Sequence, residues 1–178
     1  MKHIATLVLM LGFSVASVHA QERPVRMKFS GSMVPTSIVV QPNSITDEEL
    51  LAGDGALGSF TFRKLRTDAL APQPSSVCPG VNIPVLAAGG VFRFQDGSLL
   101  TVGLTEPGAL CIIPPQGHLT ETYEITGGTG RFRGATGSLT LKATLSLVMV
   151  SSSGQPVLLT STGTLEGTVK APGIRDEQ

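Results

Sequence analysis

Apolar and polar residues alternate with a period of two along most of the chain, which is typical of β-strands that bury one face. In 90–95, for example, Phe92 and Phe94 share one face, while Val91 and Arg93 share the other. Runs of this kind recur between turn-forming residues, at 25–33, 37–40, 58–66, 90–95, 98–104, 118–126, 138–150 and 157–169. The pattern predicts about eight strands.

The connections between these runs determine how the strands pair. Only 47–51 has a helical composition, with Ser44 or Thr46 as its N-cap, and it is too short to cross between parallel strands. Neighbouring strands are therefore expected to pair antiparallel, in an all-β barrel or a two-sheet sandwich. Closure removes unpaired strand edges, which favours an antiparallel, closed barrel of about eight strands. The strand at 138–150 should then turn one set of side chains inward: Leu139, Leu141, Ala143, Leu145, Leu147 and Met149.

The first residues predict export. Lys2 and His3 precede the apolar run 4–13, and small residues follow up to Ala20. This order is typical of a signal peptide, 1–20, cleaved after Ala20, which leaves 21–178 as a single β-barrel domain that is secreted or periplasmic. The apolar run is shorter than the roughly 20 residues of a membrane anchor, and no long apolar run follows, so no membrane span is expected.

The two cysteines, Cys78 and Cys111, are a candidate disulfide in an exported protein. Because chain direction reverses at each turn, the predicted loops 67–89 and 105–117 lie at the same end of the barrel, which permits the pairing. Two separate buried thiols are the alternative.

Charge and motifs exclude several function classes. Lys plus Arg and Asp plus Glu are equal at 13 each, so no net field attracts nucleic acid or an anionic membrane. His118 is the single histidine after the signal peptide, too few for a zinc cluster, and no metal or other cofactor is expected. No nucleophile elbow, dinucleotide fingerprint or Cys-x-x-Cys motif occurs, which disfavours an enzyme.

The predicted barrel interior is the candidate site. Its apolar lining would suit a small apolar ligand, and the residues expected there are Phe60, Phe62, Phe92, Phe94, Val102, Tyr123 and Leu145. Glu121 shares a strand face with Tyr123. If that face points inward, a desolvated carboxylate beside a phenol could act as acid or base, so both are candidate catalytic residues. In the other register, Glu121 faces solvent at the barrel rim. Arg63 and Arg93 are expected outside.

The segment 123–138, YEITGGTGRFRGATGS, combines a strand, a Gly-Gly-Thr-Gly turn, an aromatic residue and Gly-Ala-x-Gly. It resembles the allene oxide cyclase and dirigent-like barrel group, of calycin type, and especially its uncharacterised bacterial secreted members. The resemblance implies an eight-stranded antiparallel barrel with an apolar cavity, often oligomeric. The glycines are interpreted as turns rather than a phosphate loop, because neither Lys-Ser/Thr nor a helix follows. Phe132 is expected to plug one barrel end.

Three functions follow as hypotheses. The first is a non-catalytic exported barrel that binds a small apolar ligand or a protein partner. The second is a cyclase or isomerase resembling allene oxide cyclase, using Glu121 and Tyr123. The third is a structural envelope protein that forms homo-oligomers.

Overall fold

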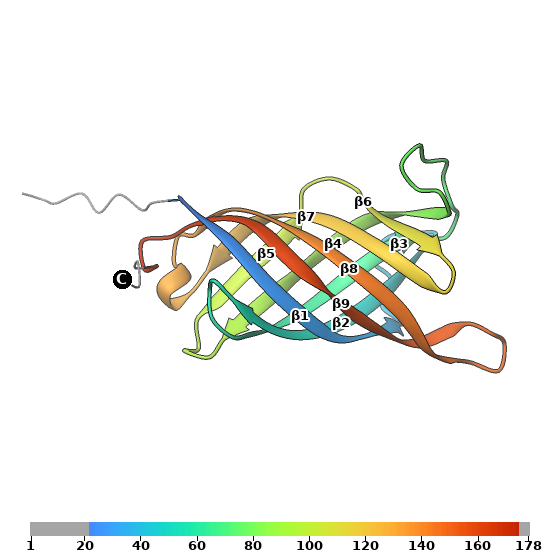
Figure 1. Ribbon diagram of the computed structural model, residues 1–178, viewed down its shortest axis with the longest axis horizontal. Helices are drawn as coiled ribbons and strands as arrows, with labels where there is room; N and C mark the ends of the chain where they lie inside the picture. Colours follow the sequence, from blue (N-terminus) through green and yellow to red (C-terminus); the bar gives the residue numbers. More distant parts are fainter. Residues whose placement is uncertain (1–21, 175–178) are drawn as a thin grey trace, which may run out of the picture.

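A computed structural model describes residues 22–174, which form nine strands and one short 3-10 helix (Figure 1). In chain order they are β1 (Glu22–Thr36), β2 (Ser44–Gly55), β3 (Phe60–Ala69), β4 (Val81–Phe94), β5 (Leu99–Leu104), β6 (Gly108–Ile113), β7 (Gln116–Gly128), η1 (Gly130–Phe132), β8 (Thr136–Val150) and β9 (Pro156–Lys170).

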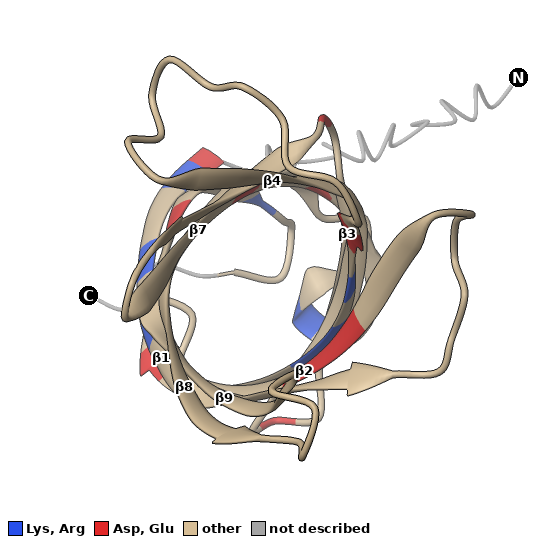
Figure 2. Ribbon diagram, turned by 90° about the vertical axis from the view of Figure 1, so that its right-hand side faces the viewer, with Lys and Arg blue, Asp and Glu red and all other residues tan. Residues whose placement is uncertain are grey.

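The strands close into one antiparallel barrel, seen along its axis in Figure 2. Each strand from β1 to β4 pairs with the next, β7 to β9 do the same, and β9 returns to β1. β5 and β6 both pair with β4 and β7, so these two short strands share one position in the ring. The nine strands therefore occupy eight positions, which confirms the predicted eight-stranded closed barrel over the sandwich.

Side chains of alternate residues fill one end of the barrel, as the period of two predicts. Phe62 and Phe92 are register partners on β3 and β4, and their rings stack with centroids 3.8 Å apart. Phe132 of η1 is fully buried against Phe94, at 4.6 Å, so it plugs this end. The Arg131 guanidinium covers the rings of Phe94 and Phe132 at 4.9 and 4.8 Å. We call this the plugged end.

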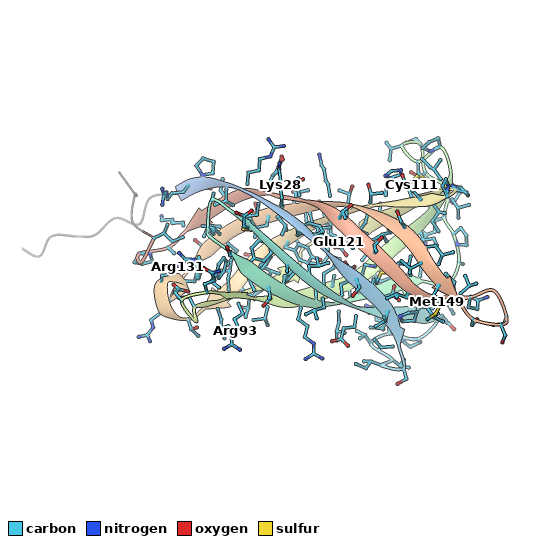
Figure 3. The ribbon with its side chains drawn as sticks, turned by 60° about the horizontal axis from the view of Figure 1, so that its bottom comes forward. Lys28, Arg93, Cys111, Glu121, Arg131 and Met149 are labelled. Carbon is cyan, nitrogen blue, oxygen red and sulfur yellow. A yellow bond between two sulfur atoms is a disulfide. The ribbon has the colours of Figure 1, made fainter. Side chains whose placement is uncertain are left out.

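The predicted disulfide lies at the opposite end and is confirmed. Cys78, in the loop 70–80, is bonded to Cys111 on β6, with their Cα atoms 5.6 Å apart. The two cysteines are therefore not the separate thiols of the alternative. Figure 3 shows Cys111 and Met149 at this disulfide end, Arg131 at the plugged end, and Glu121 between them.

Two predicted elements near the start of the barrel are wrong. The segment 47–51 is part of strand β2 rather than a helix, because pairing with β1 and β3 overrides its local composition. The segment 37–40 is a loop rather than a strand. The Thr36 hydroxyl accepts a hydrogen bond from the Ile38 N–H, and Asn43 has a positive φ of 55°, so the chain turns away from the ladder.

Other boundaries also shift. The predicted loop 67–89 shrinks to 70–80, and the predicted loop 105–117 contains β6 and the start of β7. Met149 leaves the predicted inward face and is 54% exposed, because the β8–β9 register shifts between Leu147 and Met149, and Leu147 is 51% exposed. The predicted signal peptide, 1–20, lies outside the described residues. Within 22–174, no helix has the length and apolar character that a membrane span requires.

Candidate functional site

The inward face of β3 changes character halfway along the barrel. Phe60 and Phe62 at the plugged end are followed, in the same alternation, by Lys64, Arg66 and Asp68, all buried. Neighbouring strands supply the counter-charges: Asp47 and Glu49 from β2, Glu121 and Tyr123 from β7. We call these seven side chains the charged cluster: Asp47, Glu49, Lys64, Arg66, Asp68, Glu121 and Tyr123.

Lys64 is the centre of the first half of the cluster. Its ammonium lies 3.1 Å from Glu49 Oε1, is hydrogen-bonded to Glu121 Oε2, and lies 3.3 Å from the Tyr123 hydroxyl. Tyr123 donates to Glu121 Oε2 at 2.7 Å. Burial, and next the charge of Glu121, raise the pKa of the Tyr123 phenol well above its ordinary value. Tyr123 is therefore a neutral donor that fixes the Glu121 carboxylate.

Arg66 organises the second half. It donates to Glu49 Oε1 at 3.1 Å through Nη1, to Asp47 Oδ2 at 3.0 Å through Nη2, and to Asp68 Oδ2 at 3.1 and 2.9 Å through Nε and Nη2. Burial alone would lower the pKa of Arg66, but the surrounding carboxylates, Asp68 and Glu49 foremost, raise it above its ordinary value. Arg66 is thus a permanent cation enclosed by carboxylates.

The cluster has more acid than base. Its four carboxylates face two cations, Lys64 and Arg66. Burial raises the pKa of Asp47 to about 6 and also raises the pKa of Asp68, although Arg66 opposes both shifts. Three carboxylate oxygens lack a hydrogen-bond partner among residues 22–174: Glu49 Oε2, Asp68 Oδ1 and Glu121 Oε1. Unpartnered buried oxygens are costly, so the cluster can accept further donors.

A pocket of about 860 Å³ lies between this cluster and the disulfide end. That volume is within the range of about 300–1,000 Å³ typical of small-molecule sites. Most of its lining is apolar: Met33, Pro35, Ile45, Ala69, Leu70, Ile83, Leu110, Ile112, Pro114, Pro115, Leu145, Leu147, Pro156 and Leu159. Three charged residues also line it, Asp47, Arg66 and Asp68. The pocket thus has apolar walls and a charged floor.

The candidate residues from the sequence are divided between core and pocket. Glu121 and Tyr123 are fully buried and hydrogen-bonded to each other, so Glu121 does not face solvent at the rim. Leu145 lines the pocket. The other predicted cavity residues are buried in the core and are not among the pocket lining: Phe60, Phe62, Phe92, Phe94, Val102 and Tyr123. Arg63 and Arg93 lie outside, as expected.

Five charged residues of the cluster escaped the sequence analysis: Asp47, Glu49, Lys64, Arg66 and Asp68. The period of two that places Phe60 and Phe62 inward continues through Lys64 and Arg66, and this was the available signal. It carried little weight, because a charged residue in a strand is normally assigned to the solvent face. On β2, the helical interpretation of 47–51 concealed the alternation of Asp47, Glu49 and Leu51.

Comparisons with known proteins add a structural likeness. No family model matches the chain, and no curated protein matches it. Among solved structures, the chain is similar to a pterocarpan synthase dirigent protein, with 14% sequence identity and a TM-score of 0.42 over 91% of this chain and 98% of that one. At this identity and TM-score the similarity does not establish a family, and the resemblance of 123–138 to the dirigent-like barrel group stays a prediction.

Proposed function

We propose that this protein is an exported barrel that binds a small, largely apolar molecule in the pocket at the disulfide end, without catalysing its conversion. The observation that carries the proposal is the pocket itself, about 860 Å³ in volume with mostly apolar walls. Burial of apolar ligand surface against such walls supplies the binding free energy, and a few polar groups orient the ligand.

Export rests on the predicted signal peptide and agrees with the disulfide, since disulfides persist mainly in oxidising compartments. The mass of the mature protein tests it, because cleavage after Ala20 leaves Gln21 as the first residue.

The cyclase or isomerase alternative has weaker support. Glu121 and Tyr123 are inside the barrel, but neither is among the residues that line the pocket. Glu121 Oε2 and the Tyr123 hydroxyl are engaged with each other and with Lys64. A substrate in the pocket would meet Asp47 and Asp68 instead. The homo-oligomer and protein-partner alternatives stay predictions, and light scattering at micromolar concentration would test the homo-oligomer.

Binding is tested with a neutral fluorescent probe, N-phenyl-1-naphthylamine, and a variant that narrows the pocket. Ile83 on β4 and Leu159 on β9 both line it, and the two strands lie on opposite sides of the ring (Figure 2). The double variant Ile83→Trp/Leu159→Trp should weaken probe binding about tenfold or more, because the added rings fill space that the probe needs.

The matched control places the same two tryptophans on the outer face of the same strands, as Val91→Trp/Thr162→Trp, at exposed positions. This control should bind the probe as the wild type does. Equal binding by both double variants would show that the probe binds elsewhere and would overturn the proposal.

A further inference from the structure

The proposed function leaves the class of ligand open, and the floor of the pocket narrows it. Resting on that proposal, we infer that the pocket takes a cationic amphiphile, whose ammonium head is held by Asp47 and Asp68 and whose apolar body lies against the walls.

The first step concerns which charges the pocket presents. Of its three charged lining residues, Arg66 has a side chain with 0% exposure, whereas the side chains of Asp47 and Asp68 keep 7% and 10%. The guanidinium is therefore covered by its carboxylate partners, and the floor presents acid to a ligand. An anionic head would find the cation inaccessible.

The second step concerns hydrogen-bonding capacity. Arg66 uses Oδ2 of both Asp47 and Asp68. Asp68 Oδ1 has no hydrogen-bond partner among residues 22–174. Asp68 lines the pocket, and the terminal torsion of an aspartate is broad, so its carboxylate can adjust to a ligand on the pocket floor. A head group that donates hydrogen bonds would satisfy an acceptor that residues 22–174 leave unpartnered.

The third step is the charge balance. The cluster's carboxylates outnumber its cations by two when all are ionised. A neutral donor such as an alcohol could satisfy Asp68 Oδ1 but could not offset this excess. An ammonium does both, and charge-assisted hydrogen bonds are roughly twice as strong as neutral ones.

The fourth step concerns the other end of the ligand. Ile45, Leu70 and Leu147 line the pocket and are also 46%, 57% and 51% exposed, so they form its mouth. Apolar side chains thus line both the walls and the mouth of the pocket, beside the polar residues Gln116, Ser146 and Gln155. This arrangement fits an elongated apolar body with its polar head at the bottom.

The test compares decylamine, decanol and decanoate as competitors of N-phenyl-1-naphthylamine, at pH 7.5 and below micelle-forming concentrations. Decylamine should compete about tenfold better than decanol, and decanoate worst. Asp68→Asn should reduce the preference for amine over alcohol several-fold, because Asp47 is then the one carboxylate of the pocket floor that holds the head group. The control Asp54→Asn, an exposed aspartate on β2, should keep the wild-type preference.

A second measurement on the wild type remains informative if Asp68→Asn does not fold. The groups that face Asp47 are Arg66, Asp68 and Glu49, and β1, β4, β6, β7, β8 and β9 contribute no titratable residue to the pocket. The preference for decylamine over decanol should therefore fall several-fold between pH 7.5 and pH 5, because the amine stays protonated while the carboxylates of the pocket floor lose negative charge.

The outcomes separate this inference from the proposed function. Equal competition by amine and alcohol, or a preference that does not change with pH, would overturn the cationic head and leave apolar binding intact. A probe that does not bind the wild type at all would overturn both.

Discussion

The two neighbouring cations of β3 provide a direct test of the charged cluster. Arg63 points outward and pairs with Glu48, with side chains 73% and 30% exposed. Lys64 points inward and has 0% exposure, in contact with Glu49, Glu121 and Tyr123. Replacing each cation by Met removes one positive charge from the same strand, in two different surroundings.

The losses of unfolding free energy in the two variants should differ several-fold. Lys64→Met leaves Glu49 and Glu121 buried without their ammonium, and removing one partner of a buried ion pair costs about 3–5 kcal/mol. Arg63→Met breaks a solvated pair, which is worth about 0–1 kcal/mol. In a chain of 178 residues, about 1 kcal/mol shifts Tm by roughly 2–4 °C. Lys64→Met should thus lower Tm by about 6–20 °C, and Arg63→Met by at most about 4 °C.

The assays are thermal unfolding, which gives Tm, and urea unfolding, both at pH 7.5 with the disulfide oxidised and followed by far-ultraviolet circular dichroism and by Tyr123 fluorescence. The m-values of the variants should match that of the wild type, so that midpoints report stability. If both variants lose less than about 1 kcal/mol, Lys64 is not held as described, and the reasoning about the cluster fails.

A double-mutant cycle isolates the pair within the cluster. Lys64→Met/Glu121→Gln should be more stable than Lys64→Met alone, by about 1 kcal/mol or more, because the second substitution removes a stranded carboxylate. Strictly additive losses would mean that the Lys64–Glu121 contact carries no coupling.

Three further predictions concern other parts of the barrel. Burial raises the pKa of Asp47 to about 6, so this group's contribution to stability is present below about pH 4 and is lost as pH rises through 6. The unfolding free energy of Asp47→Asn should therefore rise relative to that of the wild type by up to about 3 kcal/mol between pH 4 and pH 7.5, measured by urea unfolding at both pH values. A difference in unfolding free energy that does not change with pH would contradict the pKa shift. Tyr123 is the single tyrosine and its pKa is well above 10.0, so absorbance at 295 nm should show no phenolate until alkaline unfolding, and a reversible titration of the folded protein near pH 10 would count against its burial. The double variant Cys78→Ser/Cys111→Ser removes a covalent link across 33 residues, and its unfolding free energy, measured by denaturant unfolding, should be lower by about 3–4 kcal/mol. A decrease below about 1 kcal/mol would mean that the disulfide does not restrict the unfolded chain.

The fold could be predicted from the sequence because most strands follow one simple rule. Where the inward face is apolar, as at Phe92 and Phe94 on β4 or Leu139 and Leu141 on β8, the period of two gives both the strand and its orientation. The rule failed on β2, whose inward face carries Asp47 and Glu49 beside Leu51. It also could not show that β5 and β6 share one ring position, because that depends on their common partners β4 and β7.

The candidate site was harder to predict for a related reason. A buried cation is tolerated only where carboxylates from other strands meet it, and these contacts are set by register. Lys64 meets Glu121, which is 57 residues away in the sequence, and Arg66 meets Asp47, 19 residues away. Glu121 was found because apolar neighbours share its face. Lys64 and Arg66 share a face with Phe60 and Phe62, but their charge outweighed that signal, so their role emerges only with the closed barrel.

The composition of the cluster supports the proposed binding role, because stability alone does not explain it. Replacing a buried ion pair by apolar residues of similar volume is often neutral or stabilising, so stability alone does not account for buried charge. The aromatic half of the same barrel shows that apolar side chains can fill this interior, with Phe62 stacked on Phe92. The charges instead lie where the packed core ends and the pocket begins, with Asp47 and Asp68 on the pocket side. Arg66 holds these two carboxylates in place and is itself covered by them. The barrel therefore carries its buried charge at the level where a ligand in the proposed pocket would meet Asp47 and Asp68.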